Sequence, residues 1–197
     1  MSKSAEDYDK WLTPRKWPLS DESGWSSYIP ADWSEPADWS EYIHVFNDGG
    51  RSNYFKGKTG DCVTRAISIA SDQDYKKVYD DLKSLSKEYA QKRNNKASRR
   101  IKQLGNRSVR QGAYKAVYHP YLLEQDWIWI PTNHIGQEDK VYLRPSELPE
   151  GKLIVKIRRH LTVVENGSLY DTYDCSDRPT TPMVYGYYMR PQNGGQA

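Results

Sequence analysis

The spacing of apolar residues predicts helices in the first part of the chain. After Gly60, residues Val63, Ala66, Ile67 and Ala70 recur at i, i+3, i+4 and i+7, which places them in one stripe of a helix. The same spacing returns at Tyr75, Val78, Tyr79 and Leu82. It predicts a second helix from about residue 72, capped by Ser71 or Asp72. A shorter third helix is predicted over residues 109–124.

The pattern then changes to runs that are rich in β-branched and aromatic residues, which predict strands. These runs cover residues 126–132, 140–145, 152–174 and 182–189. Because the helices come first and the strands follow, we predict an α+β fold in which N-terminal helices pack on a C-terminal antiparallel sheet.

The first 45 residues differ in composition from the rest of the chain. They contain five of the seven tryptophans, interspersed prolines and a short duplication, ADWSE-P-ADWSE, at residues 31–41. We predict an irregular N-terminal extension over residues 1–45, which either packs on the domain through its tryptophans or binds a partner. The main domain is predicted at residues 46–190, with a basic mobile loop at 92–108, and a frayed tail at 191–197.

Charge is distributed unevenly along the chain. Residues 1–45 carry four Lys or Arg against nine Asp or Glu, whereas the remainder carries 25 against 17. Nine basic residues and no acidic one lie between Tyr89 and Leu123. This basic belt is predicted either to be a solvated loop or to contact an acidic partner or nucleic acid.

Several classes of protein do not fit the composition. No apolar run approaches the ~20 residues of a membrane span, and the N-terminus lacks the apolar stretch of a secretory signal. The two cysteines are far apart, and the four histidines are scattered without metal-ligand spacing. We therefore expect a cytoplasmic protein in a reducing compartment, with no disulfide framework, no metal and no cofactor.

A hairpin signal near the C-terminus brings a histidine and an aspartate together. Asn166-Gly167 lies between apolar alternations, and this dipeptide favours a two-residue β-turn. With that turn, Val164 faces Leu169, and His160 and Asp171 project from the same face of the sheet as diagonal neighbours. Asp174 falls on the opposite face. The register therefore predicts a His160–Asp171 pair.

Cys62 stands where a helix is predicted to begin. Unpaired backbone N–H groups and the helix dipole favour a thiolate at that place, and a nearby imidazolium favours it further. We predict Cys62 as a nucleophile, His160 as its base and later its acid, and Asp171 as the residue that orients the imidazole. Asp61 is predicted to cap the helix, and Cys175 to be a free thiol.

The order of these residues resembles the papain-like cysteine hydrolase superfamily. Gly60-Asp61-Cys62 opens an apolar helix, and His160 and Asp171 follow on strands. More narrowly, TGDCVTRAI (59–67), YHPYL (118–122), LIVKIRRHLTVVENGSLYDTYD (153–174) and VYGYY (184–188) look like a group of phage-encoded and bacterial proteins. The likeness covers residues 49–188. It implies a papain-like fold, the Cys62–His160–Asp171 triad and, for a phage protein, a host or viral protein as the substrate in the host cytoplasm.

The sequence departs from this superfamily before the cysteine. Papain-like enzymes usually place a Gln there as an oxyanion donor, whereas residues 53–57 read NYFKG. Asn53 or backbone amides would have to take that part.

Three functions remain open from the sequence. The first is a cysteine hydrolase of the peptidase, isopeptidase or amidase type, and the second is a transglutaminase-like acyl transferase. The third is a non-catalytic papain-like scaffold, which would bind nucleic acid or an acidic protein through Arg99, Arg100, Arg107 and Arg110.

Overall fold

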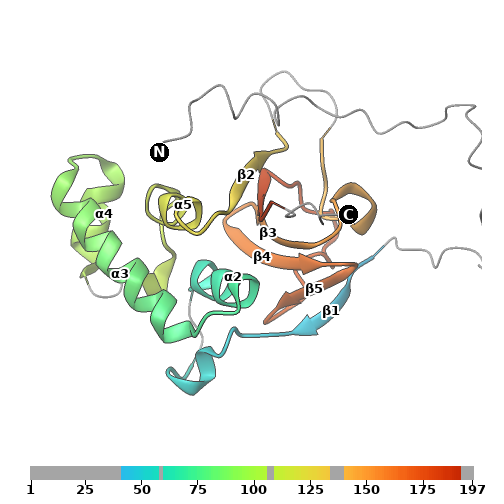
Figure 1. The fold of residues 1–197 in the computed structure, drawn as a ribbon, viewed down its shortest axis with the longest axis horizontal. Coiled ribbons are helices and arrows are strands. Elements are labelled where there is room, and N and C mark those ends of the chain that lie inside the picture. The colour runs from blue at the N-terminus through green and yellow to red at the C-terminus, as the bar shows by residue number, and fades with distance from the viewer. Residues whose placement is uncertain (1–40, 58–59, 106–108, 134–139, 192–197) are drawn as a thin grey trace, which may run out of the picture. The chain divides into compact units, whose positions relative to one another are not determined.

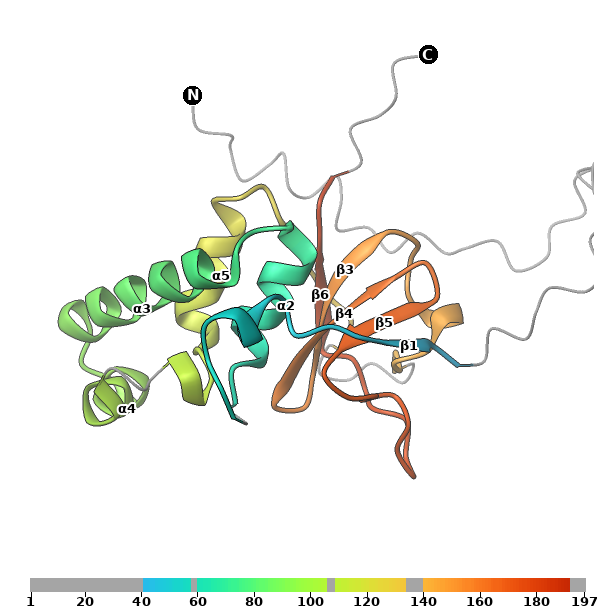
Figure 2. The same ribbon diagram turned by 90° about the horizontal axis from the view of Figure 1, so that it is seen from below.

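Helices cover one face of a mixed β-sheet (Figures 1 and 2). The structure, a computed structural model, describes residues 41–57, 60–105, 109–133 and 140–191. All of them belong to the unit Asp38–Ala197. The predicted extension up to residue 40 and the tail from residue 192 lie outside the described residues. The predicted α+β class is confirmed.

The described part contains four α-helices, six strands and three 3₁₀ turns. The helices are α2 (Cys62–Ser71), α3 (Tyr75–Lys92), α4 (Lys96–Leu104) and α5 (Lys115–Leu123). The strands are β1 (Ile43–Phe46), β2 (Ile128–Pro131), β3 (Lys152–Ile157), β4 (His160–Glu165), β5 (Ser168–Asp171) and β6 (Gly186–Met189). The turns are η1 (Arg51–Asn53), η3 (Val109–Gln111) and η4 (Pro145–Glu147).

The sheet is mixed, not antiparallel as predicted. Its strand order is β1-β5-β4-β3-β6-β2, and β1 runs parallel to β5 while the other neighbours are antiparallel. Residues 43–45 of β1 come from the segment that was predicted to be irregular. This strand is short, lies at the edge and is largely exposed, with Ile43 62% and Phe46 70% accessible. It therefore lacks the alternation that marks a half-buried strand.

The hairpin of β4 and β5 has the predicted register. Asn166 and Gly167 both have positive φ (46° and 78°), as the two-residue turn requires, and Val164 pairs with Leu169. A second two-residue turn joins β3 to β4, because Ile157 pairs with His160. His160 is therefore the first residue of its strand.

Two helix predictions need correction. α3 begins at Tyr75, and Asp74 caps it by accepting from the Lys77 N–H at 3.1 Å, so neither Ser71 nor Asp72 is its cap. The predicted basic loop at residues 92–108 contains α4, so that prediction is wrong for residues 96–104. Asn95 and Ser98 form a capping box at the start of α4. The basic side chains of α4 are good helix formers, and Ile101 is buried.

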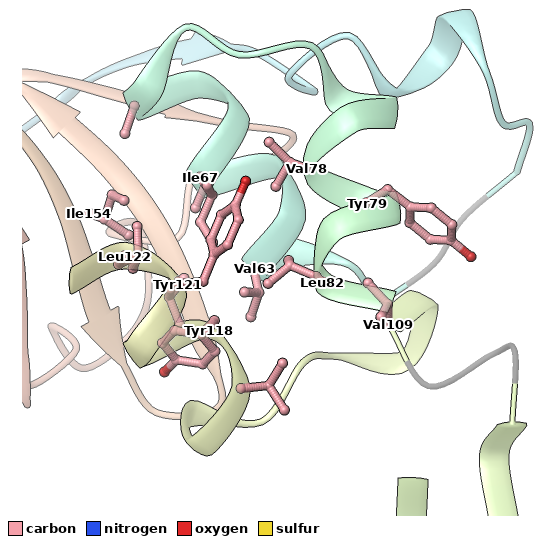
Figure 3. Close-up of a cluster of buried hydrophobic side chains, with 14 of the residues drawn as sticks. Val63, Ile67, Val78, Tyr79, Leu82, Val109, Tyr118, Tyr121, Leu122 and Ile154 are labelled. Carbon is pink, nitrogen blue, oxygen red and sulfur yellow. The ribbon is translucent and has the colours of Figure 1, made fainter. Parts of the chain in front are cut away.

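Two hydrophobic cores lie on the two faces of the sheet. Figure 3 shows the first, where Val63 and Ile67 of α2 meet Leu82 of α3, Leu122 of α5 and Ile154 of β3. The second packs against the other face, and includes Tyr42, Leu143, Leu153, Val155, Leu169, Cys175 and Val184. The predicted strand at residues 140–145 contributes only an isolated bridge between Tyr142 and Met183. Among the described residues, no helix has the length and apolar character that crossing a bilayer demands.

Candidate active site

Cys62 is the first residue of α2, as the sequence predicts. The first backbone hydrogen bond of the helix runs from the Arg65 N–H to the Asp61 carbonyl at 3.2 Å. The preceding N–H groups therefore have no acceptor within the helix. Cys62 itself is partly exposed, whereas the neighbouring residues Asp61 and Val63 are buried. Cys62 thus combines access with the positive end of a helix.

His160 and Asp171 are in direct contact. His160 begins β4 and Asp171 ends β5, and Nε2 of the imidazole lies 2.6 Å from Oδ2 of the carboxylate. Both residues are buried. The predicted pairing across the Asn166-Gly167 turn is therefore present, and it leaves Nδ1 of His160 for another partner.

The pKa values of Cys62 and His160 are shifted in opposite directions. Burial alone raises the pKa of the Cys62 thiol, but hydrogen bonding to His160, the charge of His160 and the Leu161 N–H outweigh it and lower the pKa. Burial lowers the pKa of His160, and hydrogen bonds to Asp171, Cys175 and Cys62 together raise it well above its usual range. Each shift favours the charged form, so the site favours a thiolate beside an imidazolium.

The Asp171 carboxylate is held in place from several sides. Its Oδ1 accepts from the Thr172 N–H at 2.7 Å and lies 3.5 Å from Nη2 of Arg65. Its carbonyl accepts from the Asn47 N–H at 3.0 Å. Burial raises the pKa of Asp171, but His160, the Thr172 N–H and the charge of Arg65 outweigh it and lower the pKa below its usual value. The parallel pairing of β1 thus helps to position the carboxylate that contacts His160.

Asp61 occupies the N-cap position of α2, but its side chain does not cap the helix, contrary to the prediction. The carboxylate is fully buried and lies 2.8 Å from Nε of Arg51. It also pairs with Nη1 of Arg65 and accepts from the Tyr75 hydroxyl. A buried carboxylate needs such partners, because an unpaired buried charge is costly. Arg65 therefore links Asp61 to Asp171.

Asn53 does not lie where the oxyanion donor was expected. It is exposed on η1, and within the described residues no contact joins it to Cys62. Its neighbour Arg51 is buried and pairs with Asp61. The N–H groups of the first turn of α2, which have no acceptor within the helix, are candidate oxyanion donors.

Sequence reasoning missed several residues around the thiol. The Leu161 N–H helps to lower the pKa of Cys62. Burial raises the pKa of Tyr118 and lowers that of Lys156, and the charge of Cys62 acts on both, which places them near the sulfur. Arg65 had no signal beyond its place in the apolar helix. A two-residue turn between β3 and β4 would have predicted the position of Lys156, because that turn pairs Lys156 directly with Leu161.

A second cysteine, Cys175, also lies close to His160. The ligand atoms of His160, Asp171 and Cys175 all lie within 4.8 Å of one another, and all three residues are buried. Nitrogen, oxygen and sulfur donors of this kind suit Zn²⁺. A bound zinc ion would use the imidazole and carboxylate atoms that hold each other in the His160–Asp171 pair. Metal binding and thiol activation therefore compete for the same atoms.

The four arginines that were proposed to bind a partner do not form one set. Arg99 and Arg100 are exposed on α4, whereas Arg107 lies outside the described residues. The guanidinium of Arg110 lies 5.4 Å from the centre of the Phe55 ring, and its carbonyl accepts from the Gly60 N–H at 3.1 Å. Arg110 therefore supports the loop that leads to Cys62.

Comparison with known proteins gives no relative from which a function could be transferred. The chain matches no family model, and neither a curated protein nor a solved structure is significantly similar to it.

Proposed function

We propose that the protein is a papain-like cysteine hydrolase that acts on an amide, isopeptide or related acyl bond. The observation that supports this most directly is the 2.6 Å contact between His160 and Asp171, with the same imidazole interacting with Cys62. A nucleophile, a base and a group that orients the base are the parts that covalent acyl transfer needs. The resemblance to phage-encoded proteins favours a host or viral protein as the substrate.

In this proposal the reaction begins with attack of the Cys62 thiolate on the carbonyl carbon. The new C–S bond forms as the carbonyl electrons move to oxygen, and the N–H groups at the start of α2 stabilise the oxyanion. When the C–N bond breaks, the imidazolium of His160 gives its proton to the leaving nitrogen. The acyl group is then a thioester of Cys62.

Water completes the cycle. His160, now neutral, takes a proton from the water as its oxygen attacks the thioester carbon. The C–S bond breaks, a carboxylic acid leaves and the thiolate–imidazolium pair is restored. If an amine replaces water, the same steps yield an amide, which is the transglutaminase-like alternative.

Alkylation by iodoacetamide tests the thiolate directly. At pH 6 we expect Cys62 to react at least about 10-fold faster than N-acetylcysteine, a thiol with no imidazolium beside it. His160→Ala should remove this advantage, whereas Lys87→Gln at an exposed position of α3 should keep it. Mass spectrometry should locate the label on Cys62 and not on Cys175, which is fully buried. If Cys62 reacts no faster than N-acetylcysteine, the proposal is wrong.

Hydrolysis itself can be followed with p-nitrophenyl acetate. We expect a burst of p-nitrophenolate equal to the protein concentration, an acetyl thioester on Cys62, and slower turnover. Added glycine methyl ester separates the two enzymatic functions, because N-acetylated product would indicate acyl transfer. A Cys62→Ala variant should show neither the burst nor the thioester.

One observation favours the binding function as a second candidate. On α4, Lys96, Arg99, Arg100 and Lys102 are exposed, whereas Ser98 and Ile101 are buried. Such a basic helix face can neutralise phosphates. If it does, binding of a fluorescent single-stranded DNA should weaken with salt, and R99Q/R100Q should reduce the salt slope by about 1.4. Lys87→Gln on α3 is the matched control, and unchanged binding by R99Q/R100Q would exclude this function.

A further inference from the structure

Lys156 lies beside the thiol because of its register in the sheet. It pairs with Leu161 of β4 and with Gly186 of β6, and directly paired residues project from the same face. Leu161 belongs to the core under the helices, so this is the face that α2 covers. The Leu161 N–H interacts with Cys62. Lys156 is therefore the direct strand partner of the residue whose N–H helps to lower the pKa of Cys62.

A second lysine approaches the same place from α5. Nζ of Lys115 lies 3.8 Å from the centre of the Trp129 ring. The indole itself lies directly on Gly186, where an added Cβ would be 2.4 Å from the Trp129 ring. Gly186 is the β6 partner of Lys156. Lys115 therefore contacts an indole that covers the β6 partner of Lys156, and its charge reaches Lys156.

The two lysines are partnered differently from Lys152, which lies on the same strand as Lys156. No acidic side chain of the described residues forms an ion pair with Lys115 or Lys156. Lys152, on the same strand as Lys156, pairs instead with Asp72 at 3.2 Å and with Glu165 at 3.8 Å. Burial lowers the pKa of Lys156, Cys62 opposes this, and the charge of Lys115 lowers it further. Two partly desolvated cations that repel each other favour an anion between them.

We infer that Lys115 and Lys156 form an anion subsite beside Cys62, and that the acyl substrate carries a carboxylate close to the bond that is cleaved. The inference rests on the proposed thiol chemistry, because it places the charge of the substrate relative to the attacking sulfur. The subsite holds the carboxylate near a thiolate that would otherwise repel it. The indole of Trp129 offers an apolar surface for the atoms next to that carboxylate.

Iodoacetate and iodoacetamide test the subsite, because they alkylate the same sulfur and differ in charge. For each thiol we take the ratio of the iodoacetate rate to the iodoacetamide rate. At low salt we expect this ratio to be roughly 10-fold higher for Cys62 than for N-acetylcysteine, because a positively charged site raises the association rate of an anion by at least about that factor. Lys156→Gln and Lys115→Gln should each lower this ratio, and Lys156→Arg should retain it. Lys152→Gln removes a charge from the same strand and should leave the ratio unchanged. Salt at about 1 M, where the screening length is about 3 Å, should abolish the preference.

The outcomes separate the inference from the function on which it rests. A ratio that both Lys156→Gln and Lys115→Gln leave unchanged overturns the anion subsite, even if iodoacetamide reacts rapidly. Slow iodoacetamide alkylation at pH 6 contradicts the activated thiolate instead. Because Lys115 is exposed, its substitution remains informative if the Lys156 variant does not fold.

Discussion

Arg65 Nη2 lies 3.5 Å from Oδ1 of Asp171. The other terminal nitrogen of the same guanidinium pairs with Asp61. The buried side chain of Arg65 in α2 therefore connects Asp61, which precedes Cys62, with Asp171, which contacts His160. The planar guanidinium suits this bridge, because its donors diverge in a rigid fork.

Loss of this bridge should destabilise the protein strongly. Arg65→Met leaves Asp61 with fewer partners in the interior, and we expect the free energy of unfolding to fall by about 3 kcal/mol. Urea denaturation measures it. The control is Arg99→Met on the exposed face of α4, which should change stability by no more than about 0.5 kcal/mol. Adding Asp61→Asn to Arg65→Met should recover part of the lost stability, because the buried carboxylate is then neutral. If Arg65→Met is as stable as the parent protein, the bridge does not stabilise the fold.

The charge of Asp171 should control the pH at which Cys62 becomes reactive. In Asp171→Asn the pKa of His160 falls, because the hydrogen bond and charge that raise it are weakened. A smaller fraction of His160 is then protonated and able to stabilise the thiolate. The pKa of Cys62 therefore rises, and the pH profile of its alkylation moves to higher pH. We expect at least about 10-fold slower reaction with iodoacetamide at pH 6.

Asp174→Asn is the matched control for that measurement. Asp174 accepts from the Ser176 N–H at 2.9 Å and makes no contact with His160 among the described side chains. Its substitution should leave the profile in place. If Asp174→Asn shifts the profile and Asp171→Asn does not, the assignment of the orienting carboxylate is wrong.

Removal of metal ions should not change the rate at which Cys62 reacts with iodoacetamide. EDTA is expected to leave the iodoacetamide rate of Cys62 unchanged, because the proposed chemistry uses only side chains and water. Added Zn²⁺ should slow the reaction reversibly, since His160, Asp171 and Cys175 offer it three close ligand atoms. Cys175→Ala should weaken that inhibition. A rate that EDTA lowers and Zn²⁺ restores would point to a metal centre in place of the triad.

Gly186 should not tolerate a side chain. Its φ is 149°, and an added Cβ would lie 2.4 Å from the Trp129 ring and 2.6 Å from the Ile130 carbonyl oxygen. We expect Gly186→Ala to lower the free energy of unfolding by about 1–3 kcal/mol, as overpacking does, and to change Trp fluorescence. Gly151→Ala is the control, because Gly151 also has a positive φ of 102° but has no atom near its Cβ position. Equal losses in the two variants would assign the effect to backbone strain alone.

Local chemistry in the sequence predicted the main parts of the candidate site. The apolar stripe after Gly60 placed Cys62 at the start of α2, and the structure begins that helix at Cys62. The Asn166-Gly167 turn gave the register of β4 and β5, from which the contact between His160 and Asp171 followed. These inferences succeeded because helical period and turn geometry depend on residues close together in the chain.

Features that depend on distant pairing were not predictable in the same way. β1 joins β5 in parallel across more than 120 residues, as the contact from His44 Nε2 to the Asp171 carbonyl at 3.1 Å illustrates. The partners of Asp61 come from η1, α2 and α3, so its role as an ion-pair centre and not a cap emerges only from packing.

The sequence by itself determined the α+β class, the helix that begins at Cys62 and the hairpin that pairs His160 with Asp171. The tertiary structure alone decided that Arg65 connects Asp61 to Asp171 and that Lys115 contacts the Trp129 ring, which lies on the β6 partner of Lys156. The physical reason is that periodicity and turn residues specify local geometry. Burial, in contrast, selects charge partners among all the side chains that the fold brings together.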